Sequence, residues 1–294
     1  MNTPREKSVC VFGEVLFDHF PGGETVMGGA PFNVAWHLQG LGFAPLLVSR
    51  IGADPEGEKV LHTMSRWGMD TTAVQHDPQR PTGRVTVDIV AGEPHYQIDE
   101  NCAWDALEPA PGAPCDVLYH GSLAARSPQS AHALAALRAS RPALVFVDVN
   151  LRPPWWQPEQ LESLLQGAHW VKLNTDELSA LQGESTANAA RLCLQRFNLH
   201  GLIVTRGADG AELLSADGSH LHAPCSPGIE VVDTVGAGDA FAAVMLAGLV
   251  AGWDMQATLA RAQQFAGKIV ANRGATLANC DTYLQLLREW GEAN

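Results

Sequence analysis

Asp239 is the strongest candidate for a catalytic residue, because it ends the glycine-rich stretch Asp233-Thr234-Val235-Gly236-Ala237-Gly238-Asp239. The uncharged run Ala240 to Ala251 follows, and it is too short to span a bilayer, so we expect a buried helix. The first N–H groups of a helix have no helical partner, and with the helix dipole they attract an anion. We therefore expect the 236–238 amides to hold a phosphate, while Asp239 takes a proton from the hydroxyl that attacks it.

A structural interpretation of the same stretch stays open at this point. Asp and Thr commonly cap helices, and Gly-Ala-Gly is common in turns. A short Gly-x-Gly-Asp motif therefore does not by itself distinguish a phosphate site from a capped helix.

A second group of polar residues lies near the start of the chain. Asp18 follows the first apolar strand, and Gly28-Gly29-Ala30-Pro31-Phe32-Asn33 opens the first expected helix. The Asp accepts hydrogen bonds from hydroxyls, the Asn both donates and accepts, and glycine lets the backbone come close, so Asp18, Gly28, Gly29 and Asn33 suit a polyhydroxylated ligand. A helix cap followed by a turn is the alternative explanation.

The two motifs together resemble the signatures of the ribokinase/PfkB family of carbohydrate kinases. Gly-Gly-x-x-x-Asn resembles the family's sugar-binding element, and Asp-Thr-x-Gly-Ala-Gly-Asp resembles its second signature. The resemblance covers essentially the whole chain. It implies that Gly236, Ala237 and Gly238 form an anion hole and that Asp239 is the catalytic base.

Further site residues are implied by the same resemblance. Asn174 and Glu177 match an Asn-x-x-Glu that helps to hold Mg²⁺ and its waters, and oxygen ligands suit such a cation. Thr205, Gly207 and Gly210 match a nucleotide-binding loop. Lys172 is placed to reach a phosphate, although a solvated lysine explains it equally well. Asp176 is assigned only to a capped helix start.

Three weaker predictions complete the site. The loops around Asp233, Val235 and Asn272-Arg273-Gly274-Ala275 match a region where family members bind a monovalent cation such as K⁺ through carbonyls. Arg152 at a strand end suits sugar hydroxyls or a phosphate, with a surface salt bridge as the alternative. The stretches 81–83, 121–124 and 150–156 resemble those of bacterial fructokinases, which favours fructose as the acceptor.

Composition limits the other possibilities. The 294 residues carry a net charge of −13, which disfavours non-specific binding to nucleic acids or anionic membranes. Six scattered cysteines without a Cys-x-x-Cys pair argue against a zinc site or a disulfide framework and favour a cytoplasmic protein with reduced thiols. The polar N-terminus does not resemble a signal peptide, and we expect no membrane span.

Alternating strands and helices predict a three-layer α/β/α fold with a mainly parallel sheet, formed by a single domain over residues 1–294. Two segments, about 14–27 and 82–100, interrupt this alternation and predict a small β-sheet lid. Expected strands of the main sheet cover Ser8 to Phe12, Ala44 to Ile51, Val117 to His120, Leu144 to Val149, Trp170 to Leu173, Leu202 to Thr205, 211–214 and 219–222. Expected helices begin at Pro31 and cover Asp54 to Trp67, 128–140, 158–166, 175–181, 186–197, 240–251, 255–271 and 281–290.

The leading hypothesis is therefore an ATP- and Mg²⁺-dependent sugar kinase. We expect ligands to gather at the carboxyl ends of the strands, where all the polar motifs fall. Alternatives are a kinase for 2-keto-3-deoxygluconate, a nucleoside or another ketose, and a non-catalytic sugar or nucleotide sensor on the same fold. A homodimer through the lid sheet is also expected.

Overall fold

A computed structural model describes residues 7–90, 93–110, 112–225 and 228–292. Within these ranges the largest element is a nine-stranded sheet in the order β13-β12-β11-β10-β9-β8-β1-β4-β5. Its neighbours from β11 to β5 pair in parallel, while β12 and β13 continue antiparallel at the other edge. The strands are β1 (Val9–Phe12), β4 (Leu46–Gly52), β5 (Val74–Asp77), β8 (Val117–His120), β9 (Leu144–Asp148), β10 (Trp170–Asn174), β11 (Gly201–Thr205), β12 (Ala211–Ser215) and β13 (His220–Ala223).

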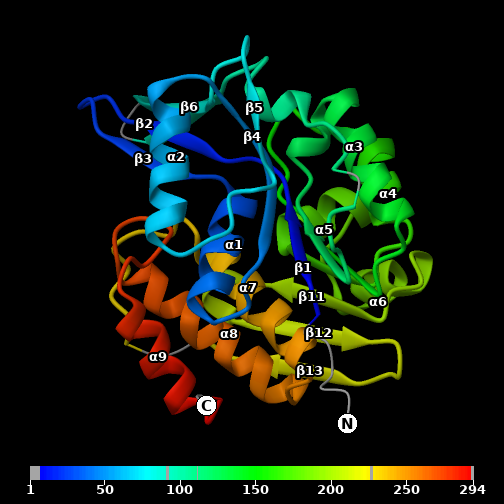
Figure 1. The fold of residues 1–294 in the computed structure, drawn as a ribbon. Coiled ribbons are helices and arrows are strands. Elements are labelled where there is room, and N and C mark those ends of the chain that lie inside the picture. The colour runs from blue at the N-terminus through cyan, green and yellow to red at the C-terminus, as the bar shows by residue number, and fades with distance from the viewer. Residues whose placement is uncertain (1–6, 91–92, 111, 226–227, 293–294) are drawn as a thin grey trace, which may run out of the picture.

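Helices cover both faces of this sheet, as the alternating sequence predicts. In Figure 1, α3 to α6 lie on one side of the sheet, and α1, α7, α8 and α9 lie on the other. The helices are α1 (Ala30–Gly40), α2 (Pro55–Arg66), α3 (Pro128–Ala139), α4 (Pro158–Leu165), α5 (Thr175–Gln182), α6 (Ala187–Arg196), α7 (Ala237–Ala251), α8 (Met255–Val270) and α9 (Cys280–Glu289), with short 3₁₀ turns η1 (Ala103–Ala106), η2 (Ala124–Arg126) and η3 (Gly207–Asp209).

A smaller sheet stands apart from the large one, in the order β3-β2-β6-β7. It contains β2 (Leu16–His19), β3 (Thr25–Gly28), β6 (Gly83–Val90) and β7 (Glu93–Ile98). The predicted hairpin is β6 and β7, and β2 joins it through parallel pairing with β6. The three-layer α/β/α fold with a small separate sheet is therefore confirmed, while a lid function for that sheet stays a prediction.

Helix α7 is buried over most of its length. Every residue from Ala240 to Gly248 is buried, because the helix packs between α1 and α8 and presents apolar side chains on all sides. Gly248 permits close packing there, since a Cβ at that position would lie 2.6 Å from the Thr258 hydroxyl. The first turn of α7 is consequently anchored by the buried part of the same helix.

Two local predictions differ from the structure. Strand β5 is absent from the predicted elements, and it extends the large sheet by pairing with β4. Ser127 precedes α3 as expected, but its side chain makes no cap hydrogen bond and donates to the Asp105 carbonyl instead.

Candidate active site

Asp239 lies in the first turn of α7 and is held by a side chain from α1. Asn33 Nδ2 donates to Asp239 Oδ2 at 2.8 Å, so the two motifs recognised in the sequence meet directly. Asn33 itself is buried, and its backbone N–H donates to the carbonyl of Gly29. The amide therefore fixes one carboxylate oxygen of Asp239 and leaves the other oxygen available to a ligand.

The surroundings of Asp239 make it a stronger base than an exposed aspartate. Burial raises the pKa of Asp239 to about 6, although the Asn33 hydrogen bond acts in the opposite direction. The charge of Asp148 raises this pKa further, while Lys172 and Arg152 lower it. The carboxylate is thus mainly ionised at neutral pH and close to the value that suits a general base.

The glycine-rich turn before α7 has the backbone geometry expected of an anion site. Gly236 caps the helix in the left-handed region (φ +79°), and Gly238 is exposed. Ala237 N is 3.4 Å from the Thr234 carbonyl, so this amide is weakly engaged by the protein itself. The amides of Gly238 and Asp239 lie in the first turn, where a helix offers no acceptor.

Lys172 adds a fixed positive charge beside this turn. A Cβ at Gly238 would lie 3.5 Å from Lys172 Nζ, which places the ammonium next to the helix start. Lys172 is buried and donates to Asp148 Oδ1 at 2.6 Å, while Tyr119 donates to Asp148 Oδ2 at 3.0 Å. Burial alone would lower the pKa of Lys172, but the Asp148 carboxylate raises it above its ordinary value. The alternative of a solvated lysine is therefore wrong.

The residues predicted to bind the sugar lie where β2, β3 and α1 meet. A Cβ at Gly28 would lie 3.2 Å from Asp18 Oδ2, so glycine leaves room for that carboxylate. Gly29 has φ +107°, and a Cβ there would lie 2.6 Å from the Glu14 carbonyl. Burial raises the pKa of Asp18 to about 6.

Glu14 is a site residue that the sequence analysis missed. It is buried, its Oε2 has no hydrogen-bond partner within the described residues, and its backbone contacts Gly29. Burial raises the pKa of Glu14 to about 7, and the negative charge of Asp239 contributes to this shift. The signal was visible in the sequence, since Glu14 is an acidic residue inside an apolar run from Val9 to Phe17.

Asn174 and Glu177 form the N-terminal cap of α5. Asn174 Oδ1 accepts from Glu177 N at 2.9 Å, and Glu177 Oε2 accepts from Asn174 N at 2.8 Å. The capping assigned to Asp176 is therefore performed by these two residues. Glu177 Oε1 also accepts from Leu151 N at 3.1 Å, and burial raises the pKa of Glu177. Both residues, with Arg152, belong to the lining of a cavity of about 300 Å³.

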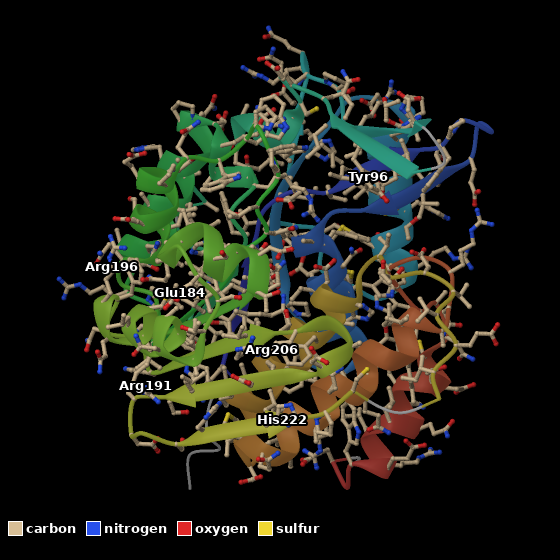
Figure 2. All side chains as sticks on the ribbon, turned by 180° about the vertical axis from the view of Figure 1, so that it is seen from behind. Tyr96, Glu184, Arg191, Arg196, Arg206 and His222 are labelled. Carbon is tan, nitrogen blue, oxygen red and sulfur yellow. The ribbon has the colours of Figure 1, made fainter. Side chains whose placement is uncertain are left out.

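The predicted nucleotide loop begins beside the same position. Thr205 is the register partner of Asn174 on the neighbouring strand, so both occupy the carboxyl edge of the sheet. Gly207 starts the turn η3 in open space, whereas Gly210 packs against the Ala223 carbonyl. Figure 2 places Arg206 and His222 at this β11–β13 end of the large sheet and Tyr96 on the small sheet.

The loops predicted to hold a monovalent cation are connected to each other. Asp233 Oδ1 accepts from Val235 N and Oδ2 accepts from Gly274 N, both at 3.0 Å. The Asp233 carboxylate thus ties the two loops together, and a cation site at the carbonyls of Asp233 and Val235 stays a prediction.

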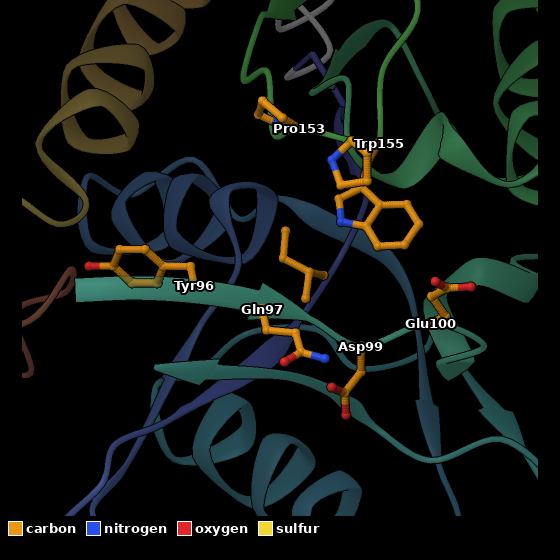
Figure 3. Close-up of a pocket in the computed structure, with 8 residues that line it drawn as sticks. Tyr96, Gln97, Asp99, Glu100, Pro153 and Trp155 are labelled. Atoms are coloured by element: carbon orange, nitrogen blue, oxygen red, sulfur yellow. The ribbon is translucent and has the colours of Figure 1, made fainter. Parts of the chain in front are cut away.

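Arg152 lies on the loop that follows β9, and its charge lowers the pKa values of Glu14, Asp18 and Asp239. Among the described residues it forms no ion pair, which contradicts the surface salt bridge considered as an alternative. The next residues, with the end of β7, line a second cavity of about 520 Å³ (Figure 3). Tyr96, Asp99 and Trp155 are part of its wall.

Over most of its length the chain matches a family model, and the match agrees with this geometry. The model of the pfkB family carbohydrate kinases covers residues 7–282. The chain belongs to the pfkB family of carbohydrate kinases. It is 34% identical to a fructokinase of Klebsiella pneumoniae over 262 residues, which cover 83% of this chain and 84% of that protein.

Solved structures share the fold. A fructokinase from Xylella fastidiosa with bound ATP has a TM-score of 0.83 at 23% identity, covering 98% of this chain and 100% of that one. Aminoimidazole riboside kinase from Salmonella enterica, complexed with aminoimidazole riboside and an ATP analogue, has a TM-score of 0.81 at 26% identity, covering 96% and 100%. These likenesses confirm the ribokinase-like fold, the family model shows a carbohydrate kinase, and the acceptor stays open.

Within the described ranges, no helix is long and apolar enough to cross a membrane. In the same part of the chain, His, Cys, Asp and Glu side chains form no group of three arranged to hold a metal. A magnesium ion at Asn174 and Glu177 would therefore need further oxygen ligands that do not come from a cluster of acidic side chains.

Proposed function

We propose that this family member transfers the γ-phosphoryl group of ATP to a hydroxyl of fructose. The observation that carries the proposal is the placement of Asp239, which is held by Asn33 at the open start of α7 and beside the Lys172 ammonium. A base, an anion-binding turn and a fixed cation from the neighbouring strand, gathered at the start of one helix, are groups that stabilise phosphoryl transfer. Fructose is supported by the 34% identity to a fructokinase.

In the proposed reaction, Asp239 accepts the proton of the acceptor hydroxyl as its oxygen attacks the γ-phosphorus. A new P–O bond forms, the bond to the oxygen bridging the β- and γ-phosphorus breaks, and ADP leaves with that electron pair. The 236–238 turn and Lys172 stabilise negative charge on the transferring group. Asp18, Gly28, Gly29 and Asn33 orient the sugar, and Thr205, Gly207 and Gly210 contact the nucleotide.

The residues at the rim fit a hydrated magnesium ion. Asn174 and Glu177 supply amide and carboxylate oxygens at the start of α5, and both belong to the lining of one cavity with Arg152. A bound Mg²⁺ would neutralise phosphate charge. The capping bonds of Asn174 and Glu177 keep both side chains oriented, so they would act mainly through the water shell of the ion.

The proposal is tested by ADP release with fructose, 2-keto-3-deoxygluconate and aminoimidazole riboside as acceptors. We expect fructose to give the highest kcat/KM. We expect Asp239→Asn to lower kcat by roughly 10²–10⁴-fold, since it removes the base. Fructose and Mg-ADP binding, measured by calorimetry, should persist in this variant. Wild-type turnover by Asp239→Asn would remove the assigned base, and no ADP release with any acceptor would leave the sensor alternative.

A nucleoside acceptor is the second candidate, and the larger cavity favours it. That cavity measures about 520 Å³ and is lined by Tyr96 and Trp155, whose rings suit stacking with a base. Higher kcat/KM for aminoimidazole riboside than for fructose would select this reading of the acceptor site.

A further inference from the structure

Two neighbouring residues of α1 hold the segment Ala275–Leu277. Trp36 Nε1 donates to the Leu277 carbonyl at 2.9 Å, and His37 Nε2 lies 3.0 Å from the Ala275 carbonyl. A carbonyl only accepts, so His37 Nε2 carries the hydrogen and Nδ1 is the acceptor. Tyr283 of α9 supplies the donor, with its hydroxyl 2.8 Å from His37 Nδ1. Trp36, His37 and Tyr283 are called the brace below.

The brace is itself tightly fixed. Trp36 stacks on Trp67 with ring centroids 4.5 Å apart, and Tyr283 packs on Gly40, where a Cβ would lie 2.7 Å from the ring. Burial lowers the pKa of His37 to about 4, so the imidazole keeps one neutral tautomer over the ordinary pH range. Each of its two hydrogen bonds therefore has one direction only.

The segment held by the brace is also the support of the glycine-rich turn. A Cβ at Gly236 would lie 2.5 Å from Ala275 Cα and 2.9 Å from the Ala275 carbonyl oxygen, so the two backbones are in direct contact. One residue earlier, Gly274 N donates to Asp233. The turn thus rests on this segment at two points, one made by packing and one by a hydrogen bond.

The turn has little other support on its N-terminal side. Val231 and Val232 are 65% and 59% exposed, and Val235 is also exposed. The Val270 carbonyl accepts from Val232 N and Asp233 N, which fixes the chain only up to that point. Besides the hydrogen bond that the Gly236 carbonyl accepts from Ala240 N at 2.9 Å, the position of the turn therefore depends on Ala275.

We propose that His37 is a positioning residue for the phosphate-binding turn, acting through the Ala275 carbonyl. The inference rests on the proposed function, because it assumes that this turn binds the γ-phosphate. His37 is fully buried and is therefore not exposed to either substrate. Its contribution is to hold Ala275 where Gly236 can pack on it, so that the 236–238 amides keep one orientation.

The test compares His37→Leu, His37→Gln and Tyr283→Phe with Leu137→Val, a core substitution in α3 away from the brace. Leucine removes both hydrogen bonds, whereas glutamine carries an amide N–H that can replace Nε2–H. The measurements are kcat and KM with fructose and Mg-ATP, calorimetric Kd values for Mg-ADP and for Mg-AMP-PNP, and thermal unfolding. The two nucleotides differ in the γ-phosphate. The ratio of their Kd values, called the nucleotide ratio, therefore measures how well the turn binds that phosphate when no acceptor is present.

We expect His37→Leu to lower kcat at least about tenfold, because small misplacements of catalytic groups have effects of this size. The KM for fructose should stay within about twofold, and Mg-AMP-PNP affinity should fall more than Mg-ADP affinity. His37→Gln should recover most of both losses. Tyr283→Phe should be intermediate, since it removes the bond that orients the imidazole and a longer 3.5 Å contact with the Leu277 carbonyl but keeps the bond from His37 to Ala275.

The opposite results are equally clear. A folded His37→Leu protein with wild-type kcat and an unchanged nucleotide ratio would overturn the proposal, as would losses no larger than those of Leu137→Val at equal stability. His37→Leu is also the variant whose folding is least assured. If it does not fold, a wild-type nucleotide ratio in both His37→Gln and Tyr283→Phe would overturn the proposal as well. A wild-type protein that releases no ADP refutes the kinase function, whereas the nucleotide ratio still tests the brace.

Discussion

At the scale of single residues, the site is defined by carboxylates that are removed from solvent. Glu14, Asp18 and Asp239 are all raised in pKa by burial, and only a few cations lie near them. These buried carboxylates are unfavourable for folding while no ligand is bound to them. They become favourable when hydroxyls donate to them, which is the property expected of a site for a polyhydroxylated acceptor.

The first prediction concerns the acid limb of the pH–rate profile. With the pKa of Asp239 at about 6, kcat/KM for fructose should rise from pH 5 and level off above about pH 7. The Asn33 hydrogen bond favours the ionised form of Asp239, so Asn33→Ala should move this limb to higher pH. Initial rates between pH 4.5 and 9 measure the shift.

Asp18 is the necessary control, because its pKa is also about 6. Asp18→Asn should weaken fructose binding and leave the midpoint of the kcat/KM limb in place. If Asp18→Asn abolishes the limb, or if Asn33→Ala leaves its midpoint unchanged, the titration belongs to a group other than Asp239.

The second prediction concerns the stability of the protein around Glu14. Its pKa is about 7 in the folded state against an ordinary 4.5, so folding favours the protonated form. This contribution is complete below about pH 4.5 and is lost as the pH rises through 7. The full difference corresponds to about 3 kcal/mol.

Glu14→Gln removes that titration, so its stability relative to wild type should increase between pH 5 and pH 8.5. Urea unfolding at the two pH values measures the change in the difference. Glu24→Gln, an exposed surface substitution, is the control and should show no such trend. A constant difference for Glu14→Gln would mean that Glu14 is already ionised in the folded protein at pH 5.

The sequence identified Asp239, Asn33 and the glycines because their types and spacing are local. It placed Lys172 where it could reach a phosphate but did not predict its ion pair, since the partner Asp148 lies 24 residues away and meets Lys172 only through the register of β9 and β10. Asp148 was visible as an acidic residue at the end of an apolar strand. Knowing that Lys172 would face it required the parallel pairing itself.

At the scale of elements, the turn before α7 depends on a glycine with a left-handed conformation. The third prediction is that Gly236→Ala lowers both stability and kcat. An alanine at φ +79° costs about 1–2 kcal/mol in backbone strain, and contact with Ala275 costs roughly another 1–3 kcal/mol. Urea unfolding and ADP-release assays measure the two effects.

Gly218→Ala is a matched control for this substitution. Gly218 has φ +90°, but nothing lies within 4 Å of its Cβ position. It should lose only the strain, with kcat unchanged. Equal losses of stability in both variants would show that the contact with Ala275 is not tight in solution.

Most helices and strands were predictable because their apolar residues repeat with the period of the element. Strand β5 was not, because Val74-Gln-His-Asp77 shows neither alternation nor a continuous apolar run. This segment forms a strand because it pairs with the free edge of β4 and because buried Asp77 forms an ion pair with Arg50. The parallel pairing of β2 with β6 is likewise a long-range contact that no local pattern encodes.

At the scale of the whole molecule, a chain with a net charge of −13 is proposed to bind the polyanion ATP. The general field of the protein opposes this binding, so local groups must overcome it. Gly238, the buried Lys172 ammonium and Arg152 lie together at the carboxyl edge of the large sheet. Affinity for ATP should therefore depend on few residues.

The last prediction concerns the small sheet, which we expect to act as a lid over the acceptor. The end of β7 and the loop at Pro153 and Trp155 line the two sides of the 520 Å³ cavity. An acceptor in that region would contact both the small sheet and the loop at Pro153 and Trp155. Water that would compete for the phosphoryl group is excluded only if the sheet and the loop close together. Backbone amides of the small sheet should therefore exchange hydrogen more slowly when fructose and Mg-AMP-PNP are bound together than with either one alone.

Hydrogen exchange followed by mass spectrometry measures this in peptides covering Leu16–Gly28 and Gly83–Val90. Peptides covering β11 and β12 serve as the internal control, because they flank the proposed nucleotide loop and should respond to Mg-AMP-PNP alone. The Asp239→Asn protein extends the experiment to fructose with Mg-ATP, since it should bind both without turnover. If protection of the small sheet does not depend on fructose, that sheet is a static wall of the site and closure must come from another element.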